Sequence, residues 1–125
     1  MTGMNLFDEA MRLLGYVSED GISGKDDMLK KALPLVNRVY SELYYSFVFV
    51  PGGEDSFKPL GLIGQELELP EKVLNDIAPY GMAMYLAQSE SDADNQVLFA
   101  SIYNQKKTRG KRVTKITDRL PHIWG

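Results

Sequence analysis

The chain contains no cysteine and only one histidine, His122, among its 125 residues. Disulfide bonds, thiol nucleophiles and thiolate metal sites are therefore excluded, and imidazole chemistry is almost excluded as well. No run of 18 apolar residues occurs, which argues against a membrane span. The first fifteen residues carry Asp8 and Glu9 and lack a basic start, so we expect no secretory signal. These absences fit a protein of a reducing compartment.

Motifs for phosphate binding and nucleophilic catalysis are also missing. The stretch Gly61 to Gly64 lacks the spacing of a phosphate loop and the Lys-Ser/Thr pair that ends one, so we interpret it as a turn. The acidic clusters at 26–27 and 90–94 lie where helices are expected to begin, and capping explains them without a metal. The sequence therefore predicts no catalytic residue, no metal and no cofactor, and we do not expect an enzyme.

The charge is divided unevenly along the chain. Residues 1–105 hold seven basic and 16 acidic side chains, whereas residues 106–125 hold seven basic side chains and one acidic one. Such an asymmetry is typical of a tail that contacts nucleic acid or an acidic protein surface. Apolar residues are interspersed within it, which indicates docking rather than solvation. The predicted partner-binding residues are Lys106, Lys107, Arg109, Lys111, Arg112, Lys115, Arg119 and Trp124.

Apolar residues at helical spacing predict two helices in the first half of the chain. The first covers residues 5–14 and ends at Gly15. The second has roughly twenty residues and is interrupted by Pro34, which should bend it. Its apolar stripe, expected to face the core, consists of Leu29, Leu33, Val36, Tyr40, Leu43 and Phe47.

The pattern changes between Phe47 and Pro70. Residues 47–50 are β-prone, and the Pro-Gly-Gly sequence at 51–53 predicts a turn. We expect a long loop or a small β-hairpin over the helical core. A loop of this length in a compact domain is usually an interface element, so residues 51–68 are a second candidate contact segment.

The second half predicts further helices. Pro70 and Glu71 begin one helix, and Pro79 divides it into residues 71–78 and 80–88. Asp92 or Asp94 caps the next helix, and Gly110 should end it. The residues of that helix expected to face inward are Val97, Phe99, Ala100, Ile102 and Tyr103. The predicted fold is an all-α compact bundle of four to five helices, with a domain over 1–105 and an extended basic tail over 106–125.

This order of elements resembles that of the head–tail connector (adaptor, head completion) proteins of long-tailed bacteriophages and prophages. The resemblance starts with Leu6–Gly15, continues with the segment around Pro34 and with Leu67–Pro70, and ends with residues 80–107. It covers nearly the whole chain, although each piece is degenerate. The residues taken as the core of the family pattern are Tyr80, Gly81, Ala83, Leu86, Ala87, Phe99 and Tyr103.

The resemblance implies a structural virion protein that docks as a homo-oligomeric ring on the phage portal protein. Such a ring extends the DNA channel, presents a surface to a tail-side connector or tail protein, and lies near packaged double-stranded DNA. The implied location is the virion head–tail junction, with the host cytoplasm before assembly and no membrane. Loops and C-terminal segments make the contacts in this family, which here means residues 51–68 and 106–125.

Two other classes of protein remain open. A small helical regulator that binds nucleic acid would explain the basic tail, and Tyr40, Tyr44 and Tyr45 could stack bases, although packing is the preferred interpretation. Against a regulator, the third and fourth helices lack a cationic recognition face. A small enzyme is disfavoured by the missing catalytic motifs.

Overall fold

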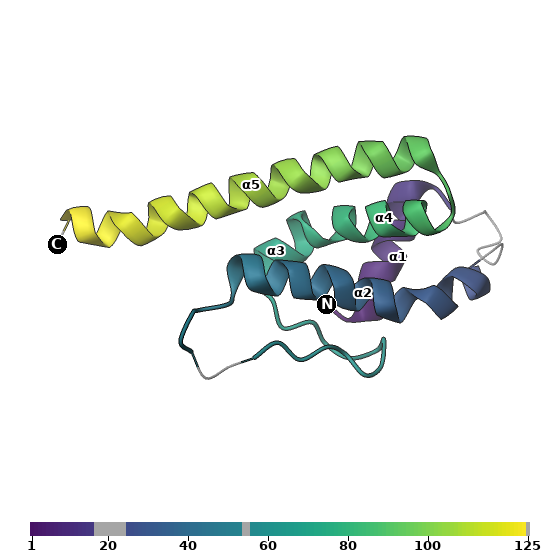
Figure 1. Ribbon diagram of the computed structural model, residues 1–125, viewed down its shortest axis with the longest axis horizontal. Coiled ribbons are helices and arrows are strands. Elements are labelled where there is room, and N and C mark those ends of the chain that lie inside the picture. Colours follow the sequence, from purple (N-terminus) through teal and green to yellow (C-terminus); the bar gives the residue numbers. More distant parts are fainter. Residues whose placement is uncertain (17–24, 54–55, 125) are drawn as a thin grey trace.

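Five helices and one long loop make up the part of the chain that the structure describes (Figure 1). The computed structural model describes residues 1–16, 25–53 and 56–124, and within these it describes the side chains of all but residues 25–26 and 112–124. The short loop expected from Ser18 to Gly24 lies outside the described residues. The helices are α1 (Gly3–Leu14), α2 (Lys25–Phe47), α3 (Glu71–Asp76), α4 (Ala78–Ser89) and α5 (Ala93–Trp124). The predicted all-α fold is confirmed.

Helix α1 is fixed at both ends by local signals. The Thr2 hydroxyl accepts a hydrogen bond from the Asn5 backbone N–H at 3.0 Å, and the Asn5 side chain accepts one from the Thr2 N–H at 2.9 Å. This reciprocal cap satisfies two backbone donors that the first turn leaves without partners. At the other end Gly15 adopts a left-handed conformation with φ of 71°, as the sequence predicted for a helix stop.

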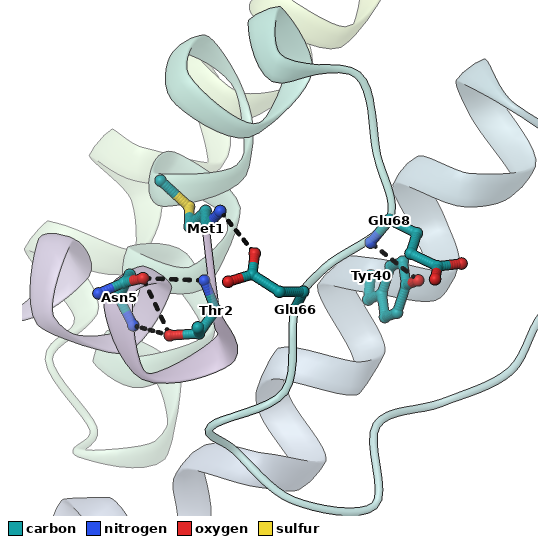
Figure 2. Close-up of polar contacts among 6 residues, drawn as sticks. All are labelled: Met1, Thr2, Asn5, Tyr40, Glu66 and Glu68. Carbon is teal, nitrogen blue, oxygen red and sulfur yellow. Dashed lines mark hydrogen bonds and ion pairs between the residues drawn. The ribbon is translucent and has the colours of Figure 1, made fainter.

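The long loop is attached to α1 and α2 through its second half (Figure 2). The backbone N–H groups of Gly3 and Met4 donate to the carbonyls of Gln65 and Ile63 at 3.1 and 2.8 Å. The Glu68 N–H donates to the Tyr40 hydroxyl at 3.1 Å. The loop therefore lies over the core as expected, and this part of it does not project freely.

No β-hairpin forms among the described residues of this loop. Its one ladder contact is an isolated antiparallel bridge between Thr2 and Glu66. The prediction of extended structure at 47–50 is wrong. Phe47 still belongs to α2, and the N–H groups of Val48 and Phe49 both donate to the Tyr44 carbonyl. An aromatic cluster of Tyr44, Tyr45, Phe49 and Phe57 covers this end of the helix, so the tyrosines pack against rings of their own chain.

Helix α2 continues through Pro34 without ending. Its buried face is shifted from the predicted stripe, since Leu29 and Leu33 are only half-buried. Proline in a helix interior removes a backbone donor, but α2 is held by burial on both sides of that position. The buried residues are Met28, Ala32, Val36, Val39, Tyr40 and Leu43.

Helix α4 lies at the centre and contacts all four other helices. The break before it falls at Ile77, two residues ahead of the predicted position, and Pro79 sits in the first turn of α4, where a missing N–H is harmless. Eight of its twelve residues are buried, so the helix is apolar around most of its circumference.

Helix α5 begins as predicted and ends later than predicted. Asp92 caps it, because its carboxylate accepts a hydrogen bond from the Asn95 backbone N–H at 3.4 Å. The same carboxylate also accepts a hydrogen bond from the Tyr16 hydroxyl at 2.6 Å. Phe99 and Tyr103 face inward, but Val97 is 71% exposed, which corrects its predicted inward position. The helix then runs through Gly110 to Trp124, so the expected stop at Gly110 is wrong, and residues 106–124 continue α5.

The close contact of α4 with α5 gives a stability test. A Cβ added to Gly81 would lie 2.6 Å from the Tyr103 ring, so Gly81→Ala must displace this buried ring or push the two helices apart. Overpacking of this kind should lower the free energy of unfolding by about 1–3 kcal/mol, measured by urea denaturation. Gly64→Ala is the matched control, since nothing lies within 4 Å of its added Cβ, and it should change stability by less than about 0.5 kcal/mol. Equal effects of the two substitutions would contradict this account of the packing.

Candidate partner-binding site

The last turns of α5 run past the ends of α2 and α3, which is clearest at the yellow end of the ribbon in Figure 1. At 1.5 Å per residue, the 32 residues of α5 span about 48 Å, far more than the twelve residues of α4. A helix of this length on a small bundle presents part of its surface outside the core. The predicted partner-binding residues all lie on α5, from Lys106 to its end.

Two of the predicted cations make contacts within the protein. The Lys106 ammonium donates to an Asp76 carboxylate oxygen at 2.9 Å and lies 4.9 Å from the Tyr80 ring centroid. The Lys107 ammonium lies 4.2 Å from the ring centroid of Tyr103, one turn earlier on the same helix. Each contact is a modest surface interaction, but the Lys106 contacts link α5 to α3 and α4.

The remaining cations differ from these two. Arg109 and Lys111 are exposed. The side chains of Arg112, Lys115, Arg119 and Trp124 lie outside the described residues, so the structure places only their backbone, in the continuation of α5. The eight predicted residues therefore lie on one helical segment. Within it, Lys106 contacts α3 and α4, and Lys107 lies over a ring of α5 itself.

A groove of about 370 Å³ lies where α5 crosses the end of α2 and the turn between α3 and α4. Its apolar lining includes Phe47, Val73 and Ile77. The charged residues around it are Lys72, Asp76, Lys106 and Arg109. Since Asp76 already pairs with Lys106, the two other cations leave the rim positive.

Gly110 forms part of this groove, a role that the sequence analysis missed. A Cβ at this position would lie 2.9 Å from a Phe47 ring carbon and 3.2 Å from the Ile77 Cδ1. Glycine is therefore required for the close approach of α5, and it does not end the helix. The sequence did contain a signal for this role, because apolar residues continue at helical spacing on both sides of Gly110.

Four of the residues that carry the resemblance meet at the interface between α4 and α5. Gly81 lies under the Tyr103 ring, and the rings of Tyr80 and Phe99 lie 6.2 Å apart. The other three, Ala83, Leu86 and Ala87, are completely buried in the core. These residues serve the packing of α4 and α5 rather than a contact with a partner.

A part-buried polar cluster connects this core to α2. Glu42 on α2 accepts hydrogen bonds from the hydroxyls of Tyr103, at 2.8 Å, and Tyr85. The Arg38 guanidinium lies 4.5 Å from the Tyr85 ring centroid. Burial, followed by the hydrogen bond and the charge of Glu42, raises the pKa of Tyr85 from 10.0 to about 12. Burial and the charge of Glu42 also raise the pKa of Tyr103.

No other functional signal emerges from the described parts of the chain. They contain no group of three or more acidic or histidine side chains placed to hold a metal ion. Within the same residues, no helix has the length and apolar character needed to cross a membrane. Comparisons with family models, curated proteins and solved structures find no match to this chain.

The raised tyrosine pKa values predict how stability depends on pH. A neutral tyrosine whose folded pKa exceeds its unfolded pKa stabilises the fold fully below pH 10, and the contribution is lost as pH rises toward 12. Of the seven tyrosines, three should ionise late in an ultraviolet absorbance titration: Tyr16, with a pKa of about 12, Tyr85 and Tyr103. The Tyr85→Phe variant should lose one of these late ionisations. A single transition near pH 10 for all seven tyrosines would contradict the raised pKa values of Tyr16, Tyr85 and Tyr103.

Proposed function

We propose that this protein is a head–tail connector of a bacteriophage or prophage, with a structural rather than catalytic role. It docks as a ring on the portal protein, extends the DNA channel and presents a surface to a tail-side connector or tail protein. Its place is the head–tail junction of the virion, after a stage in the host cytoplasm. The observation that carries the proposal is the basic, projecting end of α5 beside an apolar groove.

The physical arrangement supports docking on a protein surface. The exposed cations Arg109 and Lys111 favour an acidic partner, and the groove offers an apolar contact next to them. The rigid attachment of α5 through Lys106 and Gly110 fixes its direction, so less conformational freedom is lost on binding. A ring multiplies weak contacts, because each subunit engages two neighbours and the portal together.

Truncation after Lys111 tests the role of the projecting end. The cut removes residues 112–125 but keeps the Lys106–Asp76 ion pair and the packing of Gly110 on Phe47. We expect an unchanged thermal transition, together with a loss of portal association of at least about tenfold, because several cations are removed. Co-sedimentation with purified portal rings measures it, and electron microscopy of the mixture shows whether rings form. Undiminished association would contradict the proposal.

Charge reversal at the groove tests its role separately. Lys72→Glu and Arg109→Glu should each weaken portal association about threefold to thirtyfold without affecting folding, because both side chains are exposed on the rim. Lys30→Glu on α2 is the matched control, since Lys30 is exposed and not part of the groove. An equal effect of all three variants would indicate a response to net charge alone. Salt-sensitive binding of duplex DNA without portal binding would favour the nucleic-acid regulator instead.

A further inference from the structure

Helix α5 carries a long exposed face without charge. Residues 95–105 include no Asp, Glu, Lys or Arg, although charged residues make up 25% of the chain. Val97 and Leu98 are 71% and 52% exposed on this face. We call it the uncharged face and define it by its exposed residues, which are Val97, Leu98, Ser101, Asn104, Gln105 and Thr108.

The composition of the uncharged face is that of a contact surface. Depletion of charge distinguishes the centre of a protein interface from ordinary surface, and two neighbouring exposed aliphatic side chains add apolar area to it. Ser101, in the middle, has a short side chain and lets another backbone come close. The face therefore has the chemistry of a helix–helix contact.

The ends of the uncharged face carry opposite charges. Asp94 is exposed at its start, and Lys111 is exposed past its end. Asp94, Val97, Ser101, Asn104, Thr108 and Lys111 follow one another at alternating spacings of three and four, which places all six on one stripe of the helix. The stripe is thus acidic at one end, neutral in the middle and basic at the other end.

These observations identify the occupant, and we propose that a second copy of this chain pairs with the uncharged face in antiparallel orientation. Antiparallel pairing sets Asp94 against Lys111, Val97 against Thr108 and Ser101 against Asn104, each twice by the two-fold symmetry. Parallel pairing would instead bring Asp94 onto Asp94 and Lys111 onto Lys111. The charge distribution therefore selects one orientation.

The pair is weak and distinct from a ring contact. A stable interface buries about 800 Å² on each partner, and a single stripe of about five helical turns offers less, so the dimer is reversible. A two-fold pair is closed by its symmetry, whereas a ring needs head-to-tail contacts between different surfaces. The inference does not rest on the proposed function, and it holds for the full chain alone in solution.

Charge exchange tests the pairing directly. Sedimentation equilibrium of the full chain, from about 10 µM to about 1 mM, should show a reversible monomer–dimer equilibrium. Asp94→Lys and Lys111→Asp should each lower the association constant at least about tenfold, because two attractive contacts become repulsive. An equimolar mixture of the two variants should dimerise again. In a mixed pair, position 94 of each chain meets position 111 of the other chain with the opposite charge. Circular dichroism checks that each variant keeps its helices.

Glu71→Lys is the matched control, because Glu71 is also an exposed acid in the first turn of a helix, on α3, and it should dimerise like the unmodified chain. A chain that stays monomeric over the whole concentration range overturns the proposal. So does a dimer unaffected by both charge variants, a mixture that fails to regain association, or growth beyond the dimer.

Discussion

The contact between Gly81 and the Tyr103 ring is the constraint on which the rest of the structure depends. Only a residue without a side chain lets α4 and α5 approach this closely. At that distance the Tyr103 hydroxyl reaches Glu42 on α2, so the same ring ties three helices together. The direction of α5 is then set, which allows Lys106 to meet Asp76 and Gly110 to pack on Phe47.

The side of the bundle that the loop covers differs from the end at which α5 leaves it. Along one side the loop after α2 is fastened to α1 and α2, through backbone hydrogen bonds from Gly3 and Met4 and through paired bonds between Asn37 and Leu60. At one end α5 leaves the bundle beside an apolar groove with a positive rim. The combination is compatible with the proposed connector role, because a rigid body holds a contact surface at a constant angle.

Much of the fold follows from short-range signals in the sequence. The cap at Thr2 was not anticipated, but the stop at Gly15, the cap at Asp92 and the break near Pro79 were, because each acts through backbone geometry within one turn. The errors concern residues whose role depends on distant partners. Val97 is apolar like Phe99 but lies about 200° from it around the helix, and the packing of α5 on α4 decides which of the two is buried.

The sequence by itself determined an all-α chain, the approximate helix limits and the concentration of positive charge after residue 105, since composition and spacing carry that information. Tertiary structure decided which glycine ends a helix and which lets a helix approach: Gly15 adopts a left-handed φ of 71°, whereas Gly110 stays helical and packs against Phe47 and Ile77. It also decided that Glu42 is an acceptor for two tyrosines and that Lys106 faces the bundle. Contacts between residues far apart along the chain depend on how the helices pack, and no local pattern encodes that packing.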